Sequence, residues 1–327
     1  MLLWEPISPE FVRGIIMEFM GMILFLFCSI GTVCFSCNSS SALSVGSTGA
    51  ATCDLSEPRV LVIAFAFGIS IFTLIYLVAP FSGGHLNPAV TVGLLVGGRV
   101  TLLRAVCFVP AQIAGATVGV AFVKAVSKTN FAIAGGGANA LAGGATYGGA
   151  WTMETILTFG LVFIVFAATD AGRSRIVSHL TVLAPMAVGF WVFLSHLVAI
   201  PIDGCSINPA RTFGAAAVSG NWAQHWLYWA GPMAGAIFAS LFYSLFMEPI
   251  AMDLVDMDAY PVKLPAFPGK GTMRERNWSS LKEEIVTPPS PEAVGNENGA
   301  EPPASTMSSN MSDQQLRKRE ADPSHLV

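Results

Sequence analysis

The tripeptide Asn-Pro-Ala occurs twice in this chain, at Asn87-Pro88-Ala89 and at Asn208-Pro209-Ala210. Both copies lie in hydrophobic regions, and 121 residues separate them. Asn caps a helix N-terminus well, and Pro at the first helical position lacks the amide that would be unsatisfied there. Two such helix starts in two hydrophobic halves predict an inverted repeat, in which two half-helices point their positive N-terminal ends at a common site at mid-membrane depth.

Arg211 directly follows the second tripeptide, three residues into this expected half-helix. A permanently charged side chain in such a buried place requires a functional reason. The alternative is an arginine whose long side chain extends to the membrane surface.

Two acidic residues lie at corresponding places in apolar runs, Glu18 after Met17 and Glu154 after Met153. A carboxyl group in hydrocarbon is costly and almost always has a partner. We expect both to be structural acids that accept hydrogen bonds from the backbone of the two half-helix loops. The competing hypothesis is a proton-coupled transporter, but no substrate-sized cluster of ionisable residues accompanies them.

Composition indicates a membrane protein with a polar tail. Of the 327 residues 53% are hydrophobic and only 12% are charged, against roughly 25% charged in an ordinary soluble domain. Residues 1–247 hold 8 acidic and 9 basic residues, whereas residues 248–327 hold 13 and 8. The net charge of −4 therefore comes from the tail, and no basic stripe predicts binding to nucleic acid.

Six apolar runs are long enough, or nearly so, to cross about 30 Å of hydrocarbon as helices. They lie at residues 11–35, 60–80, 102–126, 150–169, 180–201 and 223–247. Two shorter segments, 87–97 and 208–219, begin at the two tripeptides. Non-helical backbone at membrane depth is tolerated only where it is buried in protein or lines a wet cavity. We therefore predict an all-α polytopic membrane protein with six transmembrane helices and two re-entrant half-helices that line a pore.

This pattern places a channel domain at residues 1–250, with repeats at about 8–126 and 145–247. Residues 251–327 are rich in Pro and Ser and offer little to bury, so we expect a largely disordered tail. An even number of spans puts both termini on one side. Basic residues are more frequent in loops on the cytoplasmic side of a membrane. The side that holds the termini would carry five of them, Arg13, Arg99, Arg104, Arg173 and Arg175, and the other side three, Arg59, Lys124 and Lys128. This distribution favours cytoplasmic termini.

Two loops resemble the signature loops of the aquaporins, or major intrinsic proteins. They are residues 82–91, Ser-Gly-Gly-His-Leu-Asn-Pro-Ala-Val-Thr, and residues 204–211, Gly-Cys-Ser-Ile-Asn-Pro-Ala-Arg. Three further segments, 135–139, 168–179 and 196–202, look most like the plasma membrane intrinsic proteins of plants and algae. The resemblance covers about residues 8–250. It implies a homotetramer in the plasma membrane, with one pore per subunit, no cofactor and no enzymatic activity.

The same resemblance implies a selectivity filter made of four residues. By spacing these are Phe67, His196, Cys205 and Arg211. A phenyl ring narrows the opening, while imidazole, guanidinium and carbonyl groups replace hydrogen bonds that water gives up. Each residue also has a purely structural alternative. Phe67 could pack in the hydrophobic core, His196 could be a core histidine with internal hydrogen-bond partners, and the Arg211 side chain could extend to the membrane surface. Thr212 after Arg211, together with the bulk of His196, favours water over glycerol, and we expect the Cys205 thiol to face the water path.

The resemblance also points to residues that could regulate the channel. Thr101 stands where plant relatives carry a phosphorylatable Ser, although capping the following helix is the simpler role. His179 matches a loop histidine linked to acid closure in those relatives, where a solvated histidine is the default. Glu5 fits one ligand of a divalent cation site, but Leu2 stands at the other.

We therefore predict a passive water channel that excludes protons and ions. Two alternatives remain open, a facilitator of glycerol, hydrogen peroxide or carbon dioxide, and a junctional membrane protein with little flux.

Overall fold

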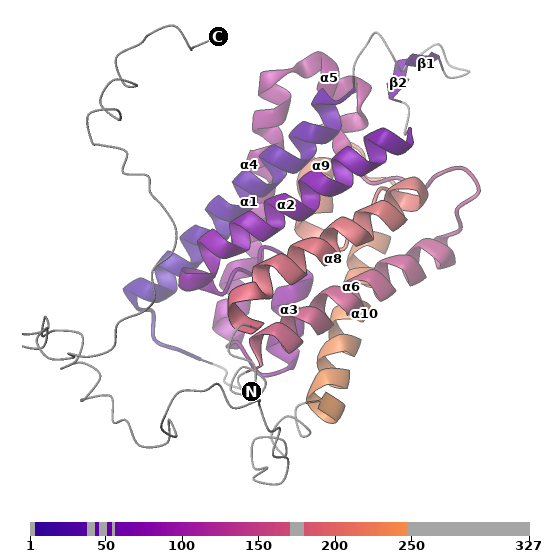
Figure 1. The fold of residues 1–327 in the computed structure, drawn as a ribbon. Coiled ribbons are helices and arrows are strands. Elements are labelled where there is room, and N and C mark those ends of the chain that lie inside the picture. Colours follow the sequence, from indigo (N-terminus) through magenta and orange to yellow (C-terminus); the bar gives the residue numbers. More distant parts are fainter. Residues whose placement is uncertain (1–3, 38–42, 46–50, 54–55, 171–179, 248–327) are drawn as a thin grey trace, which may run out of the picture. The chain divides into compact units, whose positions relative to one another are not determined.

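Six long helices and two half-helices make up the fold (Figure 1). The computed structural model describes residues 4–37, 43–45, 51–53, 56–170 and 180–247. In that part of the chain, six helices are long and apolar enough to cross a membrane. They are α1 (Pro9–Phe35), α2 (Glu57–Ser82), α4 (Leu102–Val126), α6 (Tyr147–Thr169), α8 (Leu180–Asp203) and α10 (Leu227–Phe242), which η2 (Tyr243–Met247) extends. The predicted helical membrane fold is confirmed.

The two half-helices begin at the two tripeptides. Helix α3 spans Pro88–Val96 and α9 spans Pro209–Ser219, with Asn87 and Asn208 as their N-caps. Each Asn side chain accepts a hydrogen bond from a first-turn amide, as the pairing of Asn with Pro predicts. At nine and eleven residues these helices reach only half-way through a bilayer.

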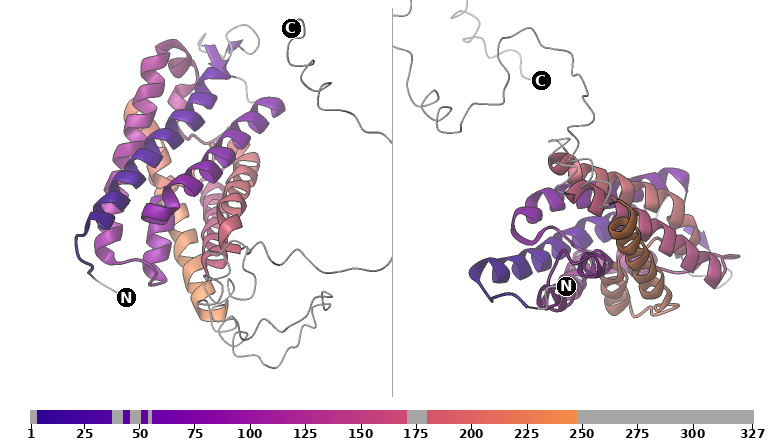
Figure 2. Two further views of the ribbon diagram at one scale, coloured as in Figure 1. Left: turned by 60° about the vertical axis from the view of Figure 1, so that its left-hand side comes forward. Right: turned by 90° about the horizontal axis from the view of Figure 1, so that it is seen from below.

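The packing of the helices reveals an inverted repeat. In the first half α1 packs on α2 and α4, and in the second half α6 packs on α8 and α10. Each half-helix packs on the last helix of the other half, α3 on α10 and α9 on α4 (Figures 1 and 2). Contacts between α2 and α8 join the halves again. The half-helices therefore meet inside the helical bundle.

Glycines allow the paired helices to approach closely at matching places. A Cβ atom at Gly115 of α4 would lie 2.3 Å from the Phe19 carbonyl oxygen on α1. A Cβ atom at Gly235 of α10 would lie 2.2 Å from the Thr155 carbonyl oxygen on α6. Small residues at such crossings let helices pack by van der Waals contact in a membrane, where water gives no hydrophobic driving force.

Shorter elements lie in the connections. A two-stranded antiparallel sheet of β1 (Leu43–Val45) and β2 (Ala51–Cys53) follows α1, a small departure from the all-helical expectation. Its three-residue strands lie in a Ser- and Gly-rich stretch whose sequence carries no strand periodicity. After α4 come α5 (Lys128–Ile133) and the 3-10 turn η1 (Gly135–Gly137). In Figure 1, α5 and the β1–β2 pair lie at the end of the bundle opposite the start of α1.

The chain divides into two units, Met1–Pro261 and Val262–Val327. The described residues all belong to the first unit, so the expected disordered tail lies outside them.

Candidate pore

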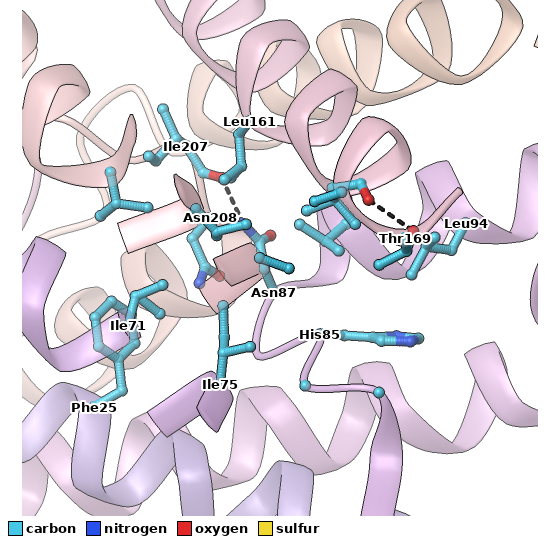
Figure 3. Close-up of a pocket in the computed structure, with 18 of the residues that line it drawn as sticks. Phe25, Ile71, Ile75, His85, Asn87, Leu94, Leu161, Thr169, Ile207 and Asn208 are labelled. Atoms are coloured by element: carbon cyan, nitrogen blue, oxygen red, sulfur yellow. Dashed lines mark hydrogen bonds between the residues drawn. The ribbon is translucent and has the colours of Figure 1, made fainter. Parts of the chain in front are cut away.

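Two reciprocal hydrogen bonds join the half-helix loops at the centre of the bundle. The Asn87 amide nitrogen donates to the Ile207 carbonyl oxygen at 2.7 Å (Figure 3), and the Asn208 amide nitrogen donates to the Leu86 carbonyl oxygen at 2.8 Å. Leu86 and Ile207 both have left-handed backbone, with φ values of 47° and 44°. Each amide nitrogen carries two N–H groups, so one N–H of each Asn is left for another acceptor.

Glu18 holds the first of these loops. Its carboxylate accepts from the backbone amides of His85 and Leu86 at 2.9 and 2.7 Å. The side chains of Ser82 and Gln112 donate to it as well, at 2.6 and 2.8 Å. Four charge-assisted hydrogen bonds satisfy a carboxylate that is fully buried.

Glu154 holds the second loop in the same way. It is fully buried and accepts from the backbone amides of Ser206 and Ile207, both at 2.6 Å. Ile207 therefore gives its N–H to Glu154 and its carbonyl oxygen to Asn87. Leu86 is bound likewise by Glu18 and Asn208, so each carboxylate fixes the residue whose carbonyl receives the opposite Asn.

A narrow cavity passes the two Asn side chains (Figure 3). Asn87, Asn208 and His196 are among its polar lining residues. Its other walls are mostly apolar side chains from α1, α2, α3, α6 and α8, among them Phe25, Ile71, Ile75, Val90, Leu161 and Val188. A cavity with apolar walls and a few aligned polar groups orients a small polar molecule while holding it weakly.

Three of the four residues expected to form the filter lie in contact. The Phe67 and His196 rings stack with centroids 4.0 Å apart and an interplanar angle of 26°. The guanidinium carbon of Arg211 lies 5.3 Å from the centroid of the Phe67 ring. Residues from α2, α8 and α9 thus meet at one place.

The hydrogen bond at Nδ1 of His196 determines whether the other ring nitrogen, Nε2, donates or accepts a hydrogen bond in the pore. Nδ1 lies 2.8 Å from the Val192 carbonyl oxygen, an acceptor only, so Nδ1 carries a proton. Nε2 is buried and has no partner among the described residues. In the neutral ring Nε2 is a hydrogen-bond acceptor beside the cavity.

Carbonyl groups and one buried amide fix the Arg211 side chain. Its NH1 group donates to the Gly137 carbonyl oxygen at 2.8 Å and to Asn139 Oδ1 at 2.6 Å, and its NH2 group donates to the Gly204 carbonyl oxygen at 3.4 Å. Asn139 Oδ1 also accepts from Thr212 at 2.7 Å. Arg211 is 3% exposed, so it does not reach the surface.

The role of Asn139 was not predicted from the sequence. This residue follows three glycines with positive φ and lies 72 residues before Arg211, so no local spacing connects the two. Its own amide donates to the Asp203 carbonyl oxygen at 3.3 Å. Asn139 thereby ties the Arg211 side chain to the end of α8.

Cys205 lies beside this group, in the loop before α9. Like Phe67 it is fully buried, and neither residue lines the cavity at the Asn pair or the one beyond Arg211, so the expectation that the Cys205 thiol faces the water path stays a prediction. The Cys205 backbone has φ 51°, and its N–H donates to Asp203 Oδ1 at 2.9 Å. This turn directs the neighbouring Gly204 carbonyl oxygen towards Arg211.

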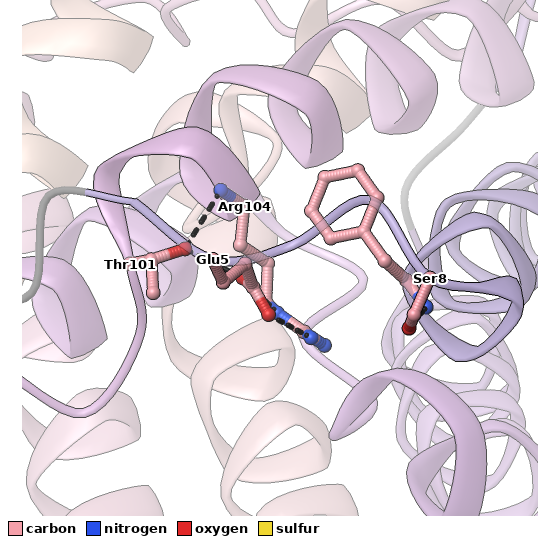
Figure 4. A network of polar contacts seen from close by, with 5 residues as sticks. Glu5, Ser8, Thr101 and Arg104 are labelled. Carbon is pink, nitrogen blue, oxygen red and sulfur yellow. Dashed lines mark hydrogen bonds and ion pairs between the residues drawn. The ribbon is translucent and has the colours of Figure 1, made fainter.

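Thr101 and Glu5 lie at the other end of the cavity system (Figure 4). Thr101 caps α4 by accepting from the Arg104 amide at 3.1 Å, and its hydroxyl donates to Glu5 at 2.5 Å. Arg104 donates to both Glu5 oxygens at 2.9 and 2.7 Å. The hydrogen bond from Arg104, helped by the one from Thr101, lowers the pKa of the Glu5 carboxyl. His179, expected to take part in gating, lies outside the described residues.

A family model described as major intrinsic protein matches residues 5–243 of the chain. The chain belongs to the major intrinsic protein family. The aquaporin architecture of two capped half-helices within six spans is therefore expected of this chain, and its relatives are membrane channels rather than enzymes.

Curated relatives point to one branch of the family. The chain is 46% identical over 244 residues to a probable aquaporin PIP2-5 of Arabidopsis thaliana, covering 73% of this chain and 82% of the relative. It is 44% identical over 246 residues to a probable aquaporin PIP2-6 of Oryza sativa subsp. japonica, covering 74% and 84%. The resemblance to plant plasma membrane intrinsic proteins is confirmed, and this major intrinsic protein is a multi-pass membrane channel.

A solved structure confirms the fold independently. The X-ray structure of the aquaglyceroporin from Plasmodium falciparum matches with a TM-score of 0.62 at 24% identity, covering 75% of this chain and 99% of that one. At this identity the likeness concerns the fold alone.

Replacing Asn139 tests whether it positions Arg211. Asn139→Ala removes one of the buried acceptors of the Arg211 guanidinium, which keeps the Gly137 and Gly204 carbonyl oxygens, and one of those of the Thr212 hydroxyl, which keeps Ser206 Oγ. Each lost hydrogen bond costs about 1 kcal/mol of stability, and more where it involves the charged guanidinium. We expect the thermal unfolding midpoint in detergent to fall by several degrees. Asn130→Ala, on the neighbouring α5, is the control and should change it little. Equal midpoints for the two variants would contradict the role of Asn139.

Proposed function

We propose that this protein is a passive, water-selective channel. One observation carries the proposal: Phe67, His196 and Arg211 are in contact between two cavities, one that His196 lines with the two Asn side chains and one that Arg211 lines. Cys205 supports this filter through its main chain, beside the Gly204 carbonyl oxygen that Arg211 contacts.

Water passing this filter exchanges its hydrogen bonds for those of the protein. His196 Nε2 accepts, the Arg211 guanidinium donates, and further along the path the free N–H groups of Asn87 and Asn208 donate. The apolar walls between these groups hold water weakly, so that it leaves as readily as it enters. Because the contacting side chains of Phe67, His196 and Arg211 lie between the two cavities, molecules larger than water are hindered there.

Protons and cations are excluded by charge. The N-termini of α3 and α9 each carry about half a positive charge, and both point at the Asn pair. A water molecule that accepts from both Asn side chains directs its own hydrogens away from the centre, which interrupts a proton-conducting chain. Arg211 adds a permanent positive charge at the filter.

We further propose that the channel is a homotetramer in the plasma membrane, with a pore in each subunit and both termini in the cytoplasm. The branch of the family to which the chain is most similar, and the bias of basic residues between loops, support this arrangement.

The cytoplasmic entrance is where we place regulation. The Thr101 hydroxyl donates to Glu5, so phosphorylation of Thr101 would replace this contact by repulsion between a phosphate and a carboxylate. His179 is the candidate proton sensor. Glu5 is already neutralised by Arg104, so it is a weak candidate for binding a divalent cation.

Enlarging the filter tests the assignment of substrate. In proteoliposomes, stopped-flow light scattering should show fast water efflux and little glycerol entry for the wild type. His196→Gly with Arg211→Val removes both bulk and charge, so glycerol entry should rise at least tenfold. His225→Gly, a histidine that does not line the pore cavities, is the control. High glycerol flux in the wild type would favour the solute facilitator, and negligible flux of both would favour the junctional protein.

A second prediction concerns pH. An imidazole with a pKa of about 6.5 gains charge between pH 8 and pH 6, and about 1.4 kcal/mol of differential interaction changes the open-to-closed ratio tenfold. The pKa of Glu5 is lowered, so its carboxylate stays ionised and paired with Arg104 above the usual pKa of a glutamate. The ion pair is lost only when the pH falls below that lowered pKa. Water permeability should therefore fall at pH 6 in the wild type and in Glu5→Gln, but not in His179→Ala. Equal wild-type permeabilities at the two pH values would exclude proton gating.

A further inference from the structure

The loops before the two half-helices can be compared residue by residue. Ser82 ends α2 and Asp203 ends α8, and each lies five residues before the Asn that caps its half-helix. Both are buried, and each accepts a hydrogen bond from the backbone amide two residues further on: Ser82 Oγ from Gly84 at 3.0 Å, and Asp203 Oδ1 from Cys205 at 2.9 Å. Such a bond stabilises a turn. The two side chains therefore hold their loops in the same way.

Glu154 has fewer hydrogen-bond donors than its counterpart Glu18. Both carboxylates are fully buried, and each accepts from two backbone amides. Glu18 also accepts from the side chains of Ser82 and Gln112, at 2.6 and 2.8 Å. In the described part of the chain, Glu154 accepts from backbone amides alone. It therefore lacks two donors that the first half of the chain supplies.

The residues at the equivalent positions explain this difference. Gln112 lies three residues before Gly115, where α4 approaches α1 closely. Pro232 lies three residues before Gly235, where α10 approaches α6 in the same way. Proline has no side-chain donor, so it does not replace Gln112. The position of the other donor, Ser82, is taken by Asp203.

Asp203 itself has an oxygen without a partner. Its side chain is fully buried, and Oδ2 has no hydrogen-bond partner among the described residues. Asp203 and Glu154 bind consecutive amides of one loop, those of Cys205 and Ser206, and the two carboxyl groups interact electrostatically. Two carboxylates that share a buried site repel each other, which favours a proton on one of them. A protonated carboxyl group is a hydrogen-bond donor.

We propose that Asp203 and Glu154 hold one proton between them, which Asp203 Oδ2 carries and donates to Glu154. The hydrogen bond from Ser82 to Glu18 is its counterpart in the first half of the chain. Each oxygen of Glu154 accepts a backbone N–H, which favours the charged form of Glu154 and leaves the proton on Asp203. One proton thus gives Glu154 a third donor and Oδ2 a partner.

This proton makes Asp203 a positioning residue of the filter. Asp203 closes the turn whose Gly204 carbonyl oxygen accepts from Arg211. Besides Glu154, the charged or titratable groups that face Asp203 are Arg211 on α9 and Tyr228 on α10, whose hydroxyl donates to the Asp203 carbonyl oxygen at 3.1 Å. With Asp203 neutral, one carboxylate of this pair opposes the Arg211 charge instead of two. The inference does not depend on which molecule the channel conducts.

Infrared spectroscopy detects this proton directly. The carbonyl stretch of a protonated carboxyl group lies at higher frequency than the bands of amides and carboxylates, and deuteration shifts it. The full chain, purified in a detergent without ester or carboxyl groups, should show such a band at neutral pH, where ordinary Asp and Glu side chains are ionised. The band should be absent from Asp203→Ser and Asp203→Asn. Glu57→Gln, at an exposed carboxylate in the first turn of α2, is the control and should keep it.

Thermal unfolding of the same variants tests the donor role. Ser and Asn at position 203 both keep an acceptor for the Cys205 amide and a donor for Glu154, as Ser82 does in the first half. Ala keeps neither. We expect Asp203→Ser and Asp203→Asn to unfold near the wild-type temperature, and Asp203→Ala to unfold several degrees lower, because two buried groups lose a hydrogen bond.

A wild-type spectrum without the band would overturn the proposal, and this result needs no substitution. A band that persists in both Asp203→Ser and Asp203→Asn would also overturn it, because the proton would then belong to another acid. Equal unfolding midpoints for Asp203→Ser and Asp203→Ala would contradict the donor role. If Asp203→Ala does not fold, the spectra of the wild type and the two polar variants decide. Loss of water flux with the band intact would count against the proposed function alone.

Discussion

The exchange of hydrogen bonds between the two half-helix loops is the constraint on which the rest of the structure depends. Asn87 donates to the Ile207 carbonyl and Asn208 to the Leu86 carbonyl, and each receiving residue gives its N–H to a buried glutamate. Irregular backbone in a membrane must be satisfied internally. Here each loop donates a hydrogen bond from its Asn side chain to a carbonyl oxygen of the other loop. Neither loop therefore has all its hydrogen-bond partners without the other half of the chain.

This constraint explains why two carboxylates are kept where burial is costly. Removing one partner from a buried, hydrogen-bonded charged group typically costs about 3–5 kcal/mol. Glu18 and Glu154 accept hydrogen bonds from backbone amides and, for Glu18, from the side chains of Ser82 and Gln112. They therefore fix both loops through their main chain.

The outline of the fold could be read from the sequence because its signals are local. Asn before Pro predicted both helix starts, and the spacing of apolar runs predicted six spans and the repeat. Phe67, His196 and Arg211 followed from the resemblance to the aquaporins, once the chain was aligned on the two signature loops. The role of Asn139 did not, since Arg211 lies 72 residues away in the sequence, and contacts made by turns leave no periodic pattern.

Side-chain orientation was also beyond the sequence. The resemblance identified Cys205 by its place in the chain, but it did not predict the left-handed turn there or the hydrogen bond from its N–H to Asp203. Thr101 shows the same limit: its capping role was expected, whereas its bond to Glu5 depends on where the segment before α1 folds back.

We propose that one pair of opposed helix ends lets water pass while blocking protons. Both fluxes can be measured in the same wild-type proteoliposomes, with osmotic shrinkage for water and an enclosed pH-sensitive dye under a potassium diffusion potential for protons. We expect water permeability at least tenfold above that of protein-free vesicles, with proton flux no higher than theirs. A proton flux that rises in proportion to the reconstituted protein would contradict it.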